Sequence, residues 1–465
     1  TRDCLHQSAQ FLRVSSPLVI VNGCQELVDA GIVCSGFDLC HVDPSVERIL
    51  ANKCQAGQAV QVFSDNPLFE MFSERALIRA RGGGVEVGEI MSAISTIGDG
   101  GVDAWVGTFA DLAGKVAAQG DDSAAAGHRT SARDSYLRAS TYFDLSYWPI
   151  YGAPVDPRLK SAAAASDEAF AKAMGLVDHY AQFIEVDLDG LAMPAWFLSP
   201  DAAGTPRRTI VHTNGYDSNV HEMYFAHALA ALDRGWNVVL FDGPGQGRCL
   251  IRDGASLRPD WEAVVGPVLD VIAARPEVAS DSVVLAGWSL GGYLAPRAAA
   301  THADRLAALV ADPGQWDQRD NVVTMLPLTD DEKAAFPNID LTKLDPIGQW
   351  LDSPDADPVM KWRIVQRGFW VNGVPDFAGY AVELCKFVLS DRAANITCPT
   401  AITQDATDPL AKNAGVLFDA LGATTKTLIK FSESDGAGGH CETLNRSLYH
   451  QRVYDWLDEV VPASR

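Results

Sequence analysis

The sequence predicts an α/β protein whose mostly parallel sheet is covered by helices on both faces, with a helical N-terminal domain and a helical insertion. Three observations support this class. From about residue 179 onward, short apolar runs alternate with helical patterns. Residues 66–173 are rich in alanine, and their apolar side chains recur at helical spacing. Residues 313–397 interrupt the alternation with helical patterns and no strand pattern.

The sheet is expected to begin with a β-hairpin, because two apolar runs, 183–188 and 191–198, flank the turn pair Asp189-Gly190. Strands and helices then alternate, as parallel pairing requires. The predicted strands are 209–213, 237–241, 282–286, 307–311, 399–403 and 425–431, and the predicted helices are 219–234, 261–274, 290–300, 411–421 and 444–460. In the N-terminal region, residues 131–148 are predicted to form one amphipathic helix or two broken ones.

Composition excludes several classes of function. The chain has 465 residues, of which 47% are hydrophobic and 21% charged, as in ordinary globular proteins. It carries 37 basic and 60 acidic residues, a net charge of −23, which disfavours binding to nucleic acids or anionic membranes. No apolar run approaches the roughly 18 residues that span a bilayer. A cytoplasmic location is favoured, but the chain begins at Thr1 rather than Met, which leaves secretion open.

Five of the nine cysteines lie within the first 54 residues. Free buried thiols are the leading interpretation, and one or two N-terminal disulfides are the alternative. A metal site is not predicted, because no Cys-x-x-Cys pair occurs and Cys40-His41 lacks the spacing of zinc ligands.

The most specific motif is Gly287-Trp288-Ser289-Leu290-Gly291, which fits the G-x-S-x-G nucleophile elbow. An apolar strand precedes it and a helix follows, as the elbow requires. Ser289 must sit on a sharp turn that exposes its hydroxyl, and larger side chains at the flanking glycines would collide with neighbouring elements. Ser289 is therefore the predicted nucleophile.

A serine hydroxyl needs a base, and with this elbow the acid and the base follow the serine in chain order. Asp408 follows the first strand after the insertion and is the predicted acid, with Asp405 as the alternative. His440 follows the last strand in a glycine-rich loop and is the predicted base.

The oxyanion hole is expected to combine two backbone N–H groups, those of Leu290 after the nucleophile and Tyr216 in the loop after strand 209–213. Gly215 allows that loop to turn. His212, within the strand, is interpreted as a core histidine with its hydrogen bonds satisfied. The run Gly243-Pro244-Gly245-Gln246-Gly247 lacks the spacing of a phosphate loop and is interpreted as a turn at the top of the sheet.

These motifs resemble one branch of the α/β-hydrolase superfamily. The resemblance rests on the elbow and on five further motifs. The helical domain of that branch is matched by Gly127-His128-Arg129 and by the segment from Ser131 to Tyr142. The five motifs are Asn214-Gly215-Tyr216-Asp217, Glu222-Met223-Tyr224-Phe225, the run 241–247, Asp312-Pro313-Gly314 and Gly436-Ala437-Gly438-Gly439-His440-Cys441. The branch includes 2,6-dihydroxypseudooxynicotine hydrolase, fungal pigment hydrolases that shorten polyketides, and fermentation–respiration switch esterases. The resemblance covers about residues 66–465.

The resemblance implies an α/β-hydrolase fold with a helical N-terminal cap domain, 61–178, and a catalytic domain, 179–465, with a helical lid insertion, 313–397. Residues 1–60 remain unassigned. It also implies a homodimer. In the C–C hydrolases of the branch an acidic residue after the sixth strand positions the substrate, and Asp312 is the match, with a structural Asp-Pro turn as the alternative. Arg133, Tyr136 and Tyr142 on the cap helix are candidate substrate contacts, with helix–helix packing as the alternative for the tyrosines.

The predicted function is therefore a serine hydrolase that needs no cofactor. It is expected to cleave a C–C bond next to a carbonyl, or an ester, in a medium-sized and aromatic or polyketide-like small molecule. Three alternatives stay open: a general carboxylesterase, an acyl transferase or cyclase of secondary metabolism that uses the same triad, and a non-catalytic binding module. Retention of Ser289, Asp408 and His440 argues against the last.

Overall fold

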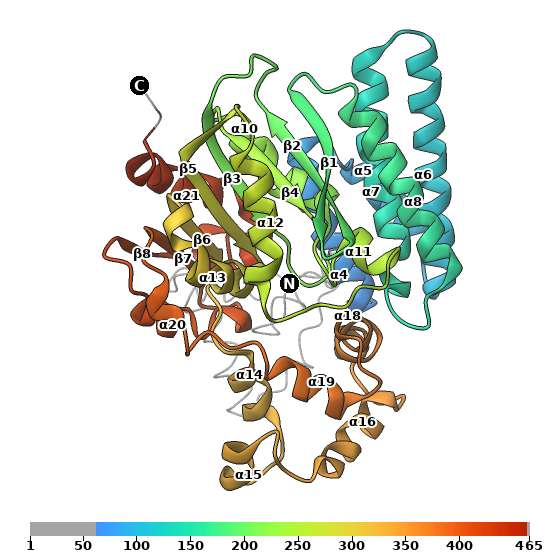
Figure 1. Cartoon of the computed structure of the whole chain (residues 1–465). Helices are drawn as coiled ribbons and strands as arrows, with labels where there is room; N and C mark the ends of the chain where they lie inside the picture. Colours follow the sequence, from blue (N-terminus) through green and yellow to red (C-terminus); the bar gives the residue numbers. More distant parts are fainter. Residues whose placement is uncertain (1–61, 463–465) are drawn as a thin grey trace, which may run out of the picture. The chain divides into compact units, whose positions relative to one another are not determined.

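The computed structural model describes residues 62–462, and its centre is an eight-stranded sheet (Figure 1). The strand order is β1-β2-β4-β3-β5-β6-β7-β8. β2 pairs antiparallel with β1 and β4, and every other pairing in this sheet is parallel. The strands are β1 (Tyr180–Leu188), β2 (Leu191–Ser199), β3 (Arg207–Thr213), β4 (Asn237–Phe241), β5 (Val278–Trp288), β6 (Ala308–Asp312), β7 (Thr400–Asp405) and β8 (Lys426–Phe431).

Both the hairpin and the parallel strands follow the sequence pattern. Asp189 and Gly190 both have positive φ, 51° and 91°, as a tight hairpin turn requires. Every residue of β4 and β6 is buried, which matches their mostly apolar sequences, because central strands are covered on both faces. The α/β class and the expected strand positions are thereby confirmed.

Helices cover both faces of the sheet. On one face, α9–η3–α10 and α21 pack with the N-terminal helices α7 and α8 around a core that includes Trp196, Tyr224 and Trp456. On the other face, α12 and α13 pack against each other, α13 against β5 and β6, and α12 against β1. The bounds are α9 (Val220–Met223), π-helical η3 (Tyr224–Ala228), α10 (Leu229–Leu232), α11 (Gly247–Ile251), α12 (Trp261–Ala273), α13 (Gly291–His302), η4 (Ala303–Arg305), α20 (Ala414–Ala420) and α21 (Arg446–Val460).

The region before the sheet is helical, as predicted. Residues 131–148 lie mainly in the single helix α7, so the two-helix alternative is wrong. The long helices α6, α7 and α8 pack side by side (Figure 1). The elements are α4 (Pro67–Ala76), η1 (Leu77–Gly82), α5 (Val87–Ile97), α6 (Val102–Ala125), α7 (Arg129–Tyr147), η2 (Trp148–Ile150) and α8 (Pro157–Met174).

Between β6 and β7 the chain leaves the sheet and forms a series of short helices, so residues 313–397 are helical as expected (Figure 1). Several begin with a side-chain cap, such as Asp376, which accepts the N–H of Gly379 at 2.7 Å. The elements are α14 (Gln318–Met325), α15 (Asp330–Ala335), η5 (Leu341–Leu344), α16 (Asp345–Asp352), α17 (Pro358–Lys361), π-helical η6 (Trp362–Gly368), α18 (Phe369–Asn372), α19 (Phe377–Leu384) and η7 (Ala393–Asn395).

Candidate active site

Ser289 occupies a strained turn between β5 and α13. Its φ is +58°, a value that a residue with a side chain rarely adopts. The glycines around it are sterically required, because a Cβ on Gly287 would lie 1.8 Å from the carbonyl oxygen of Gly291, and one on Gly292 1.9 Å from that of Pro313. The N–H of Ser289 donates to the carbonyl of Asp312 at 2.7 Å, which fixes the turn to the end of β6. The local geometry is thus that of a nucleophile elbow.

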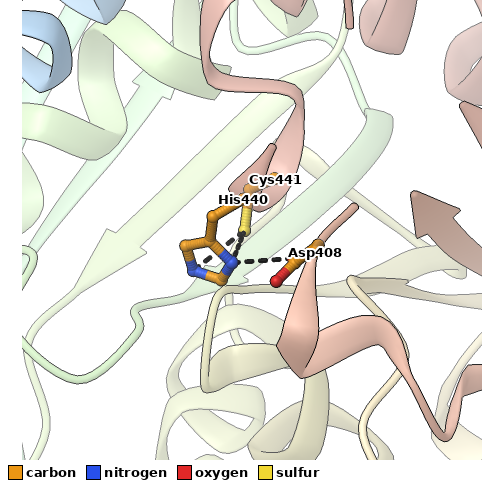
Figure 2. A group of neighbouring side chains, drawn as sticks. All are labelled: Asp408, His440 and Cys441. Atoms are coloured by element: carbon orange, nitrogen blue, oxygen red, sulfur yellow. Dashed lines mark hydrogen bonds and ion pairs between the residues drawn. The ribbon is translucent and has the colours of Figure 1, made fainter. Parts of the chain in front are cut away.

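Loops after three parallel strands bring the three predicted triad side chains together. His440 Nε2 lies 2.8 Å from Ser289 Oγ, and His440 Nδ1 lies 2.8 Å from Asp408 Oδ2. Because a carboxylate only accepts, Nδ1 carries the proton toward Asp408, and Nε2 is left to accept from the serine hydroxyl. Figure 2 shows Asp408 and His440 facing each other. This is the arrangement that a general base and its orienting acid require.

The Asp408 carboxylate is almost completely buried, with 1% of its side chain exposed. Burial raises the pKa of Asp408, but hydrogen bonds from His440 and the N–H of Leu410 outweigh that effect and lower the pKa below its ordinary value. The alternative acid, Asp405, does not reach the histidine. Its Oδ1 accepts the N–H of Thr407 at 2.7 Å, and Thr407 in turn accepts the N–H of Gly439 at 2.9 Å. Asp405 therefore orders the loops beside His440.

Cys441 lies beside the histidine ring, with its sulfur 3.4 Å from His440 Nε2 (Figure 2). Together with Asp408 and His440 it forms a group whose candidate ligand atoms lie within 4.8 Å of one another. Burial raises the pKa of the Cys441 thiol well above its ordinary value. Both ring nitrogens of His440 are already engaged, one by Asp408 and one by Ser289, so a metal bound here would have to displace these hydrogen bonds.

The loop after β3 lies against the nucleophile. A Cβ on Gly215 would lie 2.7 Å from Ser289 Cβ, so only glycine fits there. Within residues 62–462, the backbone N–H groups of Tyr216 and Leu290 have no hydrogen-bond acceptor. Two unpaired donors beside a nucleophile are the geometry in which a developing oxyanion is stabilised.

Two buried glutamines brace this region and were not predicted from the sequence. The side-chain amide of Gln246 donates to the carbonyls of Asn214 and Gly215, both at 2.9 Å, and Gln315 donates to the carbonyl of Ser289 at 2.6 Å. Gln246 lies in the run 243–247, which is a turn at the end of β4, as expected. Gln246 follows β4, which lies next to β3 in the sheet. Because the carboxyl ends of neighbouring parallel strands meet at one edge, a polar residue after β4 could have been identified as a neighbour of the loop after β3.

The carboxylate of Asp312 is held by other residues of the protein. Its side chain is completely buried, accepts the hydroxyl of Thr403 at 2.8 Å and pairs with Arg446 at 2.9 Å. A buried carboxylate is tolerated only with such partners. These contacts favour the alternative interpretation, a structural role, and a substrate contact of Asp312 stays a prediction.

The three proposed substrate contacts on α7 also point elsewhere. The hydroxyl of Tyr136 donates to Asp121 at 2.7 Å, and that of Tyr142 donates to Glu89 at 2.5 Å. Arg133 pairs with Asp134 and Asp178, and it lines a surface hollow that borders none of the three triad residues. These side chains join helices to one another and to the start of β1, which favours the packing alternative, and their substrate role stays a prediction.

His212 is a core residue, as expected, but its hydrogen bonds are not satisfied. Both ring nitrogens lack a partner within the described part of the chain, and burial lowers the pKa of His212 to about 3. Its ring packs against that of His227, with a centroid separation of 4.5 Å. His212 is therefore neutral in the native protein.

The described residues include four cysteines, Cys249, Cys385, Cys398 and Cys441, and all are free thiols. The predictions about the five N-terminal cysteines and the Cys40-His41 pair lie outside the described residues. Among residues 62–462, no helix is both long enough and apolar enough to cross a bilayer.

Comparisons with known proteins find relatives over most of the chain. The model of the alpha/beta hydrolase family matches residues 210–442. Hydrolase LUC6 from a Fusarium species is 33% identical over 405 residues, which cover 81% of this chain and 92% of the relative. The 20-hydroxy-prefusarin hydrolase FUS2 from Gibberella moniliformis is 31% identical, with 82% of this chain and 94% of the relative covered.

Among solved structures, a 2,6-dihydroxy-pseudo-oxynicotine hydrolase superposes with a TM-score of 0.65 at 21% identity, covering 84% of this chain and 95% of that chain. At this identity the likeness concerns the fold, and it confirms an α/β-hydrolase fold with helices before the sheet. With the family model matching half of the sequence and two relatives matching over most of their lengths, the chain belongs to the alpha/beta hydrolase family and is a hydrolase.

Proposed function

We propose that this hydrolase is a serine hydrolase in which Ser289 is the nucleophile, His440 the general base and Asp408 the acid that orients it. The observation that carries the proposal is the continuous chain of two 2.8 Å hydrogen bonds from Ser289 through His440 to Asp408, beside two unpaired backbone N–H groups. These are the parts that acyl transfer through a covalent intermediate needs.

The reaction follows from the positions of the protons. His440 Nε2 takes the proton of Ser289 Oγ as that oxygen attacks the substrate carbonyl, and the N–H groups of Tyr216 and Leu290 stabilise the oxyanion. The carbonyl reforms, the bond to the leaving group breaks, and His440 gives its proton to the departing carbon or oxygen. Water then attacks the acyl-serine, with His440 again accepting a proton, and releases the acid product and free Ser289.

We further propose a medium-sized, partly apolar, aromatic or polyketide-like substrate, whose C–C bond next to a carbonyl, or ester bond, is cleaved. Two features support this. One relative is named as a hydrolase of 20-hydroxy-prefusarin. Aromatic side chains from the N-terminal helices also meet those of the insertion: Tyr151 packs on Trp370 at 4.9 Å, and the indole N–H of Trp362 donates to the carbonyl of Trp148 at 3.0 Å. Residues 61–178 and 313–397 would act as cap and lid in this proposal.

The first experiment treats the protein and its Ser289→Ala variant with a fluorophosphonate and measures intact mass. Attack of Ser289 Oγ on phosphorus expels fluoride and adds one phosphonyl group. A single adduct on the parent and none on the folded variant is the expected result. Labelling of the variant at the parent rate would place the nucleophile elsewhere, and no labelling of either protein would contradict an assembled triad.

The bond type is tested separately with a panel of aryl esters and aryl β-diketones in ¹⁸O-labelled water. Hydrolysis through an acyl-serine must place one labelled oxygen in the carboxylic acid product. Preferential turnover of the β-diketones supports C–C cleavage, and turnover of esters alone supports a carboxylesterase. A product without label would indicate a transferase or cyclase.

A further inference from the structure

Asp217, the residue after Tyr216, connects three segments that are far apart in the sequence. Its Oδ1 accepts a hydrogen bond from Arg75 Nη1, in the last turn of α4, at 2.9 Å. Its Oδ2 accepts a hydrogen bond from Arg367 Nη1, in η6 of the insertion. The three side chains are 14% to 20% exposed, so water screens these ion pairs only partly.

The insertion also holds the side chain of Tyr216 itself. The guanidinium of Arg367 lies 4.7 Å from the centre of the Tyr216 ring. Asn372 Nδ2 donates to the Tyr216 hydroxyl, which donates in turn to the carbonyl of Gly368 at 3.4 Å. Tyr216 and Asp217 are therefore fixed to the same short stretch of the insertion, 367–372.

An oxyanion hole works only if its donors are already aimed at the reacting oxygen, because reorientation during the reaction costs energy. Gln246 fixes the carbonyls of Asn214 and Gly215 on one side of the Tyr216 amide. The contacts of Asp217 fix the chain on the other side. Burial raises the pKa of Asp217, but the charges of Arg75 and Arg367 outweigh it and hold the pKa below its ordinary range, so the carboxylate stays ionised.

We propose that Asp217 is a positioning residue for the oxyanion hole, and that Arg367 of the insertion, together with Arg75 of α4, aims the Tyr216 N–H at the reacting oxygen through it. This inference rests on the proposed serine-hydrolase function. In this arrangement the insertion completes the oxyanion hole and does not merely enclose the substrate.

The test uses Arg367→Met, which removes the insertion's cation and keeps the Asp217–Arg75 pair. Asp217→Asn is the less suitable variant, because it removes the ion-pair partner of Arg367 and, at the same time, one of the two partners of Arg75, which also pairs with Glu222 at 2.6 Å. Lys361→Met is the matched control: it removes a cation of the preceding helix α17, whose Nζ donates to the backbone carbonyl of Asp352 at 3.0 Å. Arg367→Lys tests rescue by a conserved charge.

The measurement is the rate of fluorophosphonate labelling, separated into the limiting rate kinact and the reagent affinity KI. Removing one oxyanion donor costs about 100- to 1,000-fold, so misaiming it should lower kinact about tenfold or more for Arg367→Met, with KI changed less than about twofold. Arg367→Lys should regain part of the rate, and Lys361→Met should label like the parent.

Two outcomes would overturn the positioning role while leaving the proposed function intact: a folded Arg367→Met that labels at the parent rate, or a loss that appears entirely in KI. Absence of labelling in the parent would instead contradict the proposed function itself. Unfolding curves for all four proteins show whether each variant is folded at the assay temperature.

Discussion

The guanidinium of Arg446 lies 2.9 Å from the carboxylate of Asp312, and both side chains are buried. The carbonyl of Asp312 accepts the N–H of Ser289, and Arg446 Nη1 also donates to the carbonyl of Cys441 at 2.7 Å. One ion pair thus joins the turn that carries the serine to the loop that carries the histidine.

Loss of Arg446 should be strongly destabilising. Arg446→Met leaves Asp312 buried without its counter-charge, which costs on the order of 3–5 kcal/mol, and the double variant Asp312→Asn/Arg446→Met should recover part of that loss. Urea unfolding of the single and double variants measures the coupling. Arg452→Met, on the same helix but in an exposed pair with Asp435, is the control and should cost at most about 1 kcal/mol. Equal effects at positions 446 and 452 would contradict the structural role.

The choice between the two acidic residues after β7 can be tested by kinetics. Asp408→Asn should lower kcat about 10⁴-fold, because His440 would lose the partner that fixes its tautomer. Asp405→Asn should cost less than about tenfold, because Asp405 acts only on the loop through Thr407. Steady-state kinetics on any ester that the parent turns over gives the comparison. A larger loss at Asp405 than at Asp408 would reverse the assignment.

Gly215→Ala should abolish most activity while leaving the protein folded. The new methyl group would lie 2.7 Å from Ser289 Cβ and 3.0 Å from the carbonyl of Trp288, so the serine or the loop must move. A displacement of about 1 Å at a reacting group costs on the order of 100-fold in rate. Gly107→Ala in α6, where nothing lies within 4 Å of the new carbon, is the matched control and should keep full activity. Normal labelling of Gly215→Ala would show that the loop lies farther from the serine.

Two buried histidines, His212 and His221, should make opposite contributions to the pH dependence of stability. Burial lowers the pKa of His212 to about 3. Below about pH 6.5 the unfolded chain therefore binds a proton that the native protein does not, and the stability decreases as the pH is lowered. For His221, burial lowers the pKa, but Asp144 and Asp167 outweigh it and raise the pKa to about 10. Its contribution is complete below about pH 6.5 and is lost as the pH rises through about 10.

Urea unfolding at pH 4 to 10 measures the contributions of both histidines to stability. Each titrating group contributes a slope of about 1.4 kcal/mol per pH unit. His212→Leu should reduce the slope of the free energy of unfolding against pH on the acid side, and His221→Gln should reduce that slope on the alkaline side. The exposed His128→Gln should change neither. An unchanged acid slope in His212→Leu would mean that this histidine is protonated in the native state.

The sequence predicts those parts of the site that depend on short local patterns. Ser289 is identified by its flanking glycines, and His440 by its loop after the last strand. The sequence does not reveal which side chains meet across long separations. Nothing near Asp312 indicates that Arg446, 134 residues later, neutralises it. Asp217 likewise has partners 142 residues before it and 150 residues after it.

The substrate contacts predicted on α7 meet a related difficulty. Helical spacing shows which residues share a face of the helix, but α7 is buried on almost every side. Tyr142 faces α5 and Tyr136 faces α6, and the spacing of apolar residues cannot distinguish those neighbours from a substrate pocket. The homodimer implied by the resemblance stays a prediction.

The backbone of Ser289, held at a φ of +58°, has a consequence for engineering the protein. A left-handed conformation costs a residue with a side chain roughly 1–2 kcal/mol, and glycine adopts it freely. An inactive chain with glycine at this position should therefore tolerate more heat than the active one. Screens that select for heat resistance alone would enrich inactive variants. Thermostable variants must therefore be selected for turnover and for heat resistance in the same round.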